Sequence, residues 1–138
     1  MGEMREILFR GKQADSGKWV YGFISGLNDD EYGIPMTMND TEGLCDIIVN
    51  PITVGQYTGL TDKNGTKIFE GDIIHGKLGN FAVRWSEYIG AFVAGISTKI
   101  MPCLNRGTMK CYEVVGNIHD NPELLGSNIH KAETAESE

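Results

Sequence analysis

Residues 62–65 of this 138-residue chain read Asp-Lys-Asn-Gly, and they decide its fold class. Asparagine and glycine both adopt positive φ readily, so Asn64-Gly65 predicts a tight hairpin turn. The segments on either side of the turn, residues 54–60 and 66–69, are short, and we expect both to be strands. The turn and its flanks therefore predict a β-hairpin.

Short strand-like segments continue on both sides of this turn. Each contains apolar, β-branched or aromatic residues and is bounded by turn residues. They are residues 7–10, 19–24, 44–49, 73–75, 81–85, 91–96 and 112–118. The chain also has 18 glycines, and many glycines between short apolar runs favour strands and tight turns over long helices. The spacing of the segments is typical of a small barrel or sandwich, so the expected fold is mainly β.

Two segments give a weaker strand pattern. Residues 34–38 alternate apolar and polar side chains, but Pro35 has no backbone N–H to donate. A strand in this position is therefore expected at the edge of a sheet. Residues 101–110 contain Pro102 and Gly107 and are expected to form a loop.

The C-terminal part of the chain carries the one convincing helix signal. Asn121 can cap a helix, Pro122 suits its first position, and Gly126 ends it after about one turn. Residues 127–138 lack a periodic apolar face, so we expect a disordered tail. The remaining residues, 1–126, are expected to form a single domain.

The negative charge of the chain is concentrated in one segment. The net charge is −7, yet residues 19–62 contain no lysine or arginine and seven acidic residues. Such a surface repels duplex phosphate, which argues against nonspecific nucleic-acid binding through the N-terminal half. The chain has no apolar run long enough to span a membrane and no secretory signal at its start, so we expect a cytoplasmic protein without membrane contact. Its three cysteines suit a reducing compartment.

No motif in the sequence predicts catalysis or a bound cofactor. Phosphate-binding glycine loops and nucleophile elbows are both missing. His75, His119, Cys103 and Cys111 lack the spacing of a zinc site, and the acidic residues near position 30 lack the alternating ligands of a calcium loop. We expect no catalytic residue, no metal and no cofactor, and therefore a protein that is not an enzyme.

Two sets of residues are candidates for binding. Eight aromatic residues could form a stacking platform or a peptide groove, although alternate spacing along strands favours the core. They are Trp19, Tyr21, Phe23, Tyr57, Phe69, Phe81, Trp85 and Phe92. A second set of polar residues is predicted to form an interaction surface. Its members are Asp29, Asp30, Glu31, Gln56, Lys63, Asn64, Lys67 and Asp72.

Several separated motifs in the chain occur together and in order. They lie at residues 5–12, 17–22, 54–60, 62–65, 68–74 and 113–125. With them the chain resembles the YopX-like family of phage and prophage proteins over residues 4–125. Phe69 and His119 stand where the family pattern has tyrosine. The resemblance implies a β-rich fold with a small SH3-like barrel, expected over residues 65–118, with the N-terminal strands beside it. It also implies a phage or prophage origin, and it implies no molecular function.

Three functional hypotheses follow. The first is a non-enzymatic binding module, made in the cytoplasm of a bacterial host, that contacts a host or phage protein. The second is a nucleic-acid-binding protein that uses the barrel half, with lysine and arginine for phosphate and exposed aromatics for stacking. The third is a hydrolase without a local motif. Because the strands of a small β domain have edges to cover, we also expect a homo-oligomer.

Overall fold

The computed structural model describes residues 5–26, 36–40, 46–96, 99–100 and 104–126. The contacts between its residues divide the chain into two compact units, Met1–Tyr57 and Thr58–Glu138. We call them unit 1 and unit 2 and describe each by itself. The expected single domain over residues 1–126 stays a prediction. The expected tail, residues 127–138, lies outside the described residues.

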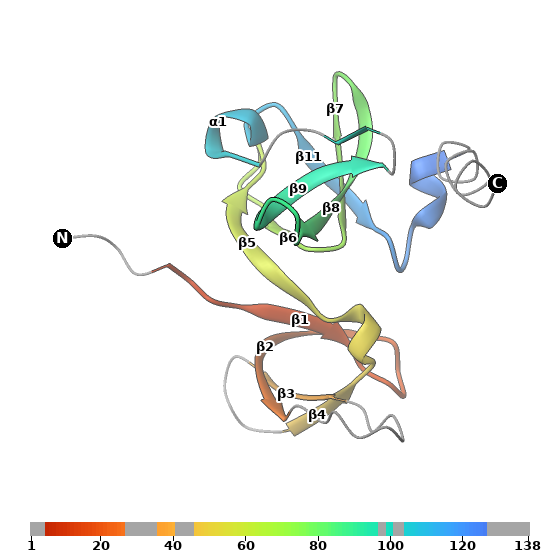
Figure 1. The fold of residues 1–138 in the computed structure, drawn as a ribbon. Helices are drawn as coiled ribbons and strands as arrows, with labels where there is room; N and C mark the ends of the chain where they lie inside the picture. The colour runs from red at the N-terminus through yellow and green to blue at the C-terminus, as the bar shows by residue number, and fades with distance from the viewer. Residues whose placement is uncertain (1–4, 27–35, 41–45, 97–98, 101–103, 127–138) are drawn as a thin grey trace. The chain divides into compact units, whose positions relative to one another are not determined.

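Unit 1 is an antiparallel sheet with the strand order β4-β3-β2-β1-β5 (Figure 1). An isolated bridge between Gln13 and Val49 also joins the chain after β1 to the last residue of β4. The elements are β1 (Phe9–Lys12), β2 (Trp19–Gly26), β3 (Met36–Asp40), β4 (Asp46–Val49), the 3-10 turn η1 (Pro51–Thr53) and the beginning of β5 (Gly55–Thr61).

The predicted edge strand at residues 34–38 is wrong in its position in the sheet. The observed strand β3 pairs with β2 on one side and with β4 on the other, so it is a central strand. It begins at Met36, after Pro35. The hydrogen bonds between β3 and its neighbours therefore need no N–H group from Pro35, so the proline does not restrict the strand to an edge of the sheet.

A glycine allows the interior of unit 1 to pack closely. A Cβ atom on Gly11 would lie 3.1 Å from Sδ of Met38 and 3.2 Å from Cβ of Val49. Both neighbours are fully buried. The Gly11 position therefore faces the packed interior of unit 1. Arg10 and Lys12, its neighbours in β1, lie on the opposite side of the strand, where Arg10 is nevertheless buried (6% exposed) and Lys12 is half-buried.

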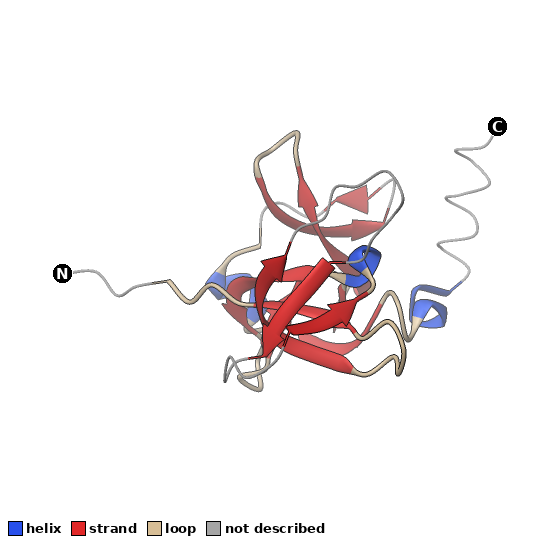
Figure 2. Ribbon diagram, turned by 90° about the horizontal axis from the view of Figure 1, so that it is seen from below, coloured by secondary structure: helices blue, strands red, loops and turns tan. Residues whose placement is uncertain are grey.

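Unit 2 contains a five-stranded antiparallel sheet with the order β10-β9-β8-β7-β11. Strands, drawn red in Figure 2, are the main secondary structure of the described residues. The last residues of β5 and the short strand β6 precede this sheet in the chain. The elements are β6 (Lys67–Phe69), β7 (Asp72–Gly76), β8 (Gly79–Ser86), β9 (Ala91–Ile96), β10 (Lys99–Ile100), the helix α1 (Arg106–Met109), β11 (Glu113–Asn117) and the 3-10 turn η2 (Pro122–Leu125).

The core of unit 2 forms between this sheet and the segments around it. Its central members are buried aliphatic and aromatic side chains, and the hydrophobic effect of removing them from water is the main stabilising term of such a unit. They are Ile68, Ile74, Phe81, Val83, Ala94, Met109 and Tyr112. The prediction of a mainly β fold with a short C-terminal helical turn is confirmed. The SH3-like barrel is not confirmed, because no sheet in the described part of the chain closes into a barrel.

The predicted turn at residues 62–65 is present and joins β5 to β6. The backbone N–H of Gly65 donates to the carbonyl oxygen of Asp62 at 3.0 Å, and Gly65 has a φ of 83°. Asn64 keeps a negative φ, so the turn uses one left-handed residue rather than two. Since β5 ends at Thr61 and β6 begins at Lys67, the loop is longer than a two-residue hairpin.

The predicted loop at residues 101–110 is wrong in part, because it contains α1. Asn105 caps this helix: its Oδ1 accepts a hydrogen bond of 2.8 Å from the backbone N–H of Thr108. Met109 at the end of α1 is fully buried in the core of unit 2. Packing therefore stabilises a helical turn that Gly107 makes unfavourable by propensity.

Candidate functional site

The residues of the predicted polar surface are divided between the two units. Lys63, Asn64 and Lys67 are exposed at the turn of unit 2, whereas Gln56 belongs to unit 1. Asp29, Asp30 and Glu31 lie outside the described residues. Asp72 is only 1% exposed, so the prediction that it contributes to a contact surface is wrong. Its Oδ2 accepts a hydrogen bond of 2.7 Å from the backbone N–H of Phe69 and so fixes the turn between β6 and β7.

Asp62 organises the exposed turn from beneath. Its side chain is 6% exposed, and its Oδ1 accepts hydrogen bonds from the backbone N–H groups of Asn64 at 2.8 Å and Thr66 at 2.9 Å. Its Oδ2 accepts a third from Val114 in β11. Burial raises the pKa of this carboxyl, but the three N–H donors and the charge of Lys63 act against it and hold the pKa below its usual value. Asp62 is therefore a structural anion.

The eight aromatic residues divide between core and surface. Tyr57, Phe69 and Phe81 are buried, as their spacing favoured. Exposed side chains are found in both units: Tyr21 and Phe23 in β2 are 42% and 49% exposed, and Trp85 in β8 is 45% exposed. Trp19 and Phe92 are half-buried. The expectation that alternate aromatic residues belong to the core therefore fails for β2.

One side of β1 and β2 carries exposed aromatic side chains, with a buried arginine and a half-buried lysine beside them. Tyr21 is the register partner of Arg10, and Trp19 is the register partner of Lys12, so these four side chains share one side of the sheet with Phe23. The guanidinium carbon of Arg10 lies 4.6 Å from the ring centre of Trp19, and Nζ of Lys12 lies 5.7 Å from it. Both distances are typical of cation–π contacts. We call Arg10, Lys12, Trp19, Tyr21 and Phe23 the aromatic face.

The sequence held a signal for this arrangement. Along β2, Val20 and Gly22 alternate with the aromatic residues, and the structure buries both of them. Along β1, buried Gly11 stands between Arg10 and Lys12. Because small residues on two neighbouring strands occupy the inner side, the large residues must lie on the outer side. Only the pairing register of the two strands shows that these positions match.

The candidate metal-binding residues do not form a cluster in the part of the chain that the structure describes. Within that part, no group of three or more histidine, cysteine, aspartate or glutamate side chains could hold an ion. His75 lies in β7, where its Nδ1 is 2.7 Å from Oδ1 of Asn80, and Cys111 is exposed. Cys103 lies outside the described residues. Helices of the described ranges are all too short or too polar to cross a membrane.

Comparison with known proteins identifies the family. The model of the YopX family, described as YopX protein, matches residues 8–126. The chain belongs to the YopX family. Its fold is similar to the crystal structure of protein EF1440 from Enterococcus faecalis, with a TM-score of 0.59 and 25% identity. That likeness covers 88% of this chain and 99% of the other. No curated protein matches the chain.

The last YopX motif of the chain, residues 113–125, has a structural explanation. Oδ1 of Asn117 accepts hydrogen bonds from the backbone N–H groups of His119 and Asp120, at 3.0 and 2.9 Å. Oδ1 of Asn121 accepts one from the N–H of Asn117 at 3.2 Å. A Cβ atom on Gly116 would lie 2.6 Å from this same Oδ1, so only glycine fits there. The motif therefore connects β11 to η2, and its polar residues act within the chain.

Proposed function

We propose that this YopX protein is a non-enzymatic protein-binding module and that it contacts its partner through the aromatic face. The observation that carries the proposal is the exposure of Tyr21 and Phe23, 42% and 49%, on a regular strand. Tryptophan, tyrosine and arginine are the residues most enriched at the energetic centres of protein interfaces. In the aromatic face Tyr21 and Phe23 are exposed, Trp19 is half-buried, and Arg10 is buried against the Trp19 ring, so the two exposed rings are the contact residues of the proposal.

The rigidity of this face also favours binding. The strand backbones of β1 and β2 are held by the antiparallel ladder, and the Trp19 ring is held by two cations. This chain would therefore lose little conformational entropy when a partner binds to the face. The expected phage or prophage origin of the family favours a partner among host or phage proteins of the bacterial cytoplasm, and we include such a partner in the proposal.

A nucleic-acid ligand is the second candidate, because the same face has aromatic rings beside cations. Two observations place it behind a protein partner. The charges of Arg10 and Lys12 already lie within 6 Å of the Trp19 ring, so a base that stacks there must compete with them. Unit 1 also has nine acidic and four basic residues, and this excess of negative charge repels phosphate.

We also keep the SH3-like description of residues 65–118 as a proposal. It is supported by the antiparallel run β7-β8-β9 with short connections and by the family resemblance. Because one fold can host many functions, this description is compatible with a binding role but does not carry it.

The experiment is an affinity capture from bacterial host lysate, with and without nuclease, that compares three forms of the chain. The forms are the native chain, the double variant Tyr21→Ser with Phe23→Ser, and the control Tyr88→Ser. Tyr88 is 99% exposed in unit 2, so its loss tests a surface tyrosine outside the aromatic face. We expect one protein that binds the native chain and the control, survives nuclease, and is lost with the double variant. Equal capture by all three forms contradicts the proposal, and recovery of nucleic acid alone replaces it with the second candidate.

A further inference from the structure

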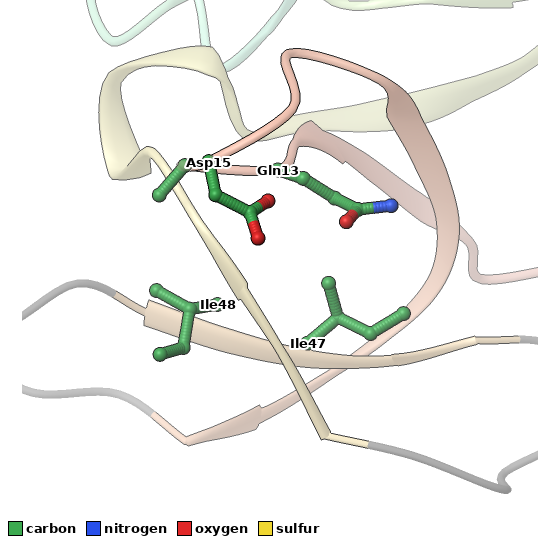
Figure 3. A pocket seen from close by; sticks show the side chains of 5 residues that line it. Gln13, Asp15, Ile47 and Ile48 are labelled. Atoms are coloured by element: carbon green, nitrogen blue, oxygen red, sulfur yellow. The ribbon is translucent and has the colours of Figure 1, made fainter.

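A hollow in unit 1 lies outside the aromatic face. It has a volume of about 320 Å³ and is formed by the turn after β1 and by β4 (Figure 3). Its walls are Gln13, Ala14, Asp15, Ile47 and Ile48. In Figure 3 the side chains of Gln13 and Asp15 approach the hollow from the turn, and the isoleucine side chains approach it from the strand.

Backbone hydrogen bonds fix the turn that forms one wall. The N–H of Gln13 donates to the carbonyl of Lys18 at 2.8 Å, and the N–H of Gly17 donates back to the carbonyl of Gln13 at 3.0 Å. Gly17 has a φ of 72°, which a residue with a side chain rarely adopts. The N–H of Ala14 donates to the carbonyl of Ile48 and ties the turn to β4. Asp15 is therefore presented by an ordered loop.

The hollow combines an apolar wall with two hydrogen-bond acceptors. Ile48 is 54% exposed, so part of its side chain remains available to cover another apolar group. Within the described ranges, no side-chain hydrogen bond or ion pair involves Asp15 or Gln13. A ligand that matches this wall needs an alkyl part for the isoleucines and a cationic donor for the carboxylate and the amide oxygen.

We propose that the hollow receives a lysine side chain of the partner protein. Lysine has a four-carbon stem and a compact ammonium group with three donors, which fits one carboxylate and one amide oxygen beside the exposed side chain of Ile48. Unit 1 has a net charge of −5, with nine acidic and four basic residues, so its field attracts a basic partner. This inference rests on the proposed protein-binding function, because it assigns part of the same partner.

The test uses a small probe in place of the partner. Isotope-labelled full-length chain is titrated with N-acetyl-lysine N′-methylamide, and the NMR signals of Asp15, Ile47 and Ile48 are followed. The norleucine analogue, which keeps the four-carbon stem and lacks the ammonium group, is the comparison ligand. We expect saturable shifts with the lysine probe and, since exposed ion pairs are weak, a roughly two- to fivefold loss of affinity in Asp15→Asn. Glu87→Gln, a charge loss in the exposed turn of unit 2, should leave the affinity unchanged.

Three outcomes overturn the inference: no shifts at the hollow, equal affinity for the norleucine analogue, or an unchanged affinity in Asp15→Asn. None of them bears on the aromatic face, because the probe experiment contains no partner protein. Loss of capture through Tyr21→Ser with Phe23→Ser tests the proposed function independently, so the two failures are distinguishable.

Discussion

The carboxylate of Asp62 accepts a hydrogen bond of 2.8 Å from the backbone N–H of Val114, which lies 52 residues later in the chain. The same side chain accepts bonds from Asn64 and Thr66, so it connects the turn before β6 to β11. An asparagine at position 62 keeps one acceptor oxygen and brings an NH₂ group against N–H donors. We expect Asp62→Asn to lower the free energy of unfolding by about 1–3 kcal/mol. Urea denaturation at pH 7 measures this free energy. If Asp62→Asn lowers it no more than Glu87→Gln does, Asp62 does not stabilise the connection between the turn and β11.

The pH dependence of stability provides a second test of Asp62. Its pKa in the folded state is lowered, so its contribution is present above the usual carboxyl pKa of about 3.9 and is lost as pH falls through the lower folded value. The native chain should therefore lose its advantage over Asp62→Asn below about pH 4. Unfolding midpoints at several pH values between 2 and 7 measure this. A difference that grows as pH falls would mean that the carboxyl pKa is raised instead.

Gly76 at the end of β7 leaves room for an aromatic ring. A Cβ atom there would lie 2.5 Å from Cε2 of Tyr112, whose ring is buried and packs edge to face with Phe81. We expect Gly76→Ala to cost about 1–3 kcal/mol of stability through overpacking. Gly107→Ala is the matched control, because its Cβ would meet only Oδ1 of Asn105, at 3.4 Å. Alanine there should be neutral or slightly stabilising. Equal unfolding midpoints for the two variants would show that the ring moves freely.

Exposed and buried phenylalanines should differ sharply in their contribution to stability. Phe23 is 49% exposed and Phe81 is 6% exposed. We expect Phe81→Ala to cost about 3–5 kcal/mol and Phe23→Ser to change stability by only about 0.5 kcal/mol. Chemical denaturation of both variants measures the contrast. A large loss in Phe23→Ser would indicate that the aromatic face is covered within the folded chain, and it would remove the basis of the proposed function.

The chain contains two tryptophans, and each unit has one of them. In the variants Trp19→Phe and Trp85→Phe, the remaining tryptophan reports on unit 2 and unit 1 respectively. If residues 1–126 form one domain, both variants should unfold in a single transition that coincides with the loss of circular dichroism signal in the same variant. In either variant, fluorescence and circular dichroism midpoints that differ would show two domains that unfold independently.

The sequence predicted most of the strands because their signals are local. Short apolar runs between turn residues mark β2, β7, β8 and β9 within a few residues of their observed bounds. The central position of β3 was not predictable in this way, since it depends on pairing with β2 and β4. The helix α1 was missed because Gly107 weakens its local signal, whereas burial of Met109 stabilises it in the folded chain.

The candidate site was less predictable than the fold. Large aromatic residues at alternate positions normally indicate the core, and nothing within residues 19–23 alone shows that Val20 and Gly22 face inward instead. The assignment requires the register of β1 against β2. Asp72 was wrongly assigned to the surface for a related reason. A charged residue in a turn motif is usually exposed, and only the tertiary structure shows that this one is buried beside Phe69.

The position of β11 beside β7 has a consequence for how the protein is made. A ribosome releases β7, β8 and β9 before it has synthesised residues 113–117, so one side of β7 stays open during that interval. The carboxylate of Asp62 has no Val114 to bind in the same interval. A nascent chain that stops before β11 therefore has an unpaired strand edge and an incompletely bonded, buried anion. Completion of unit 2 is therefore expected only after β11 has left the ribosome.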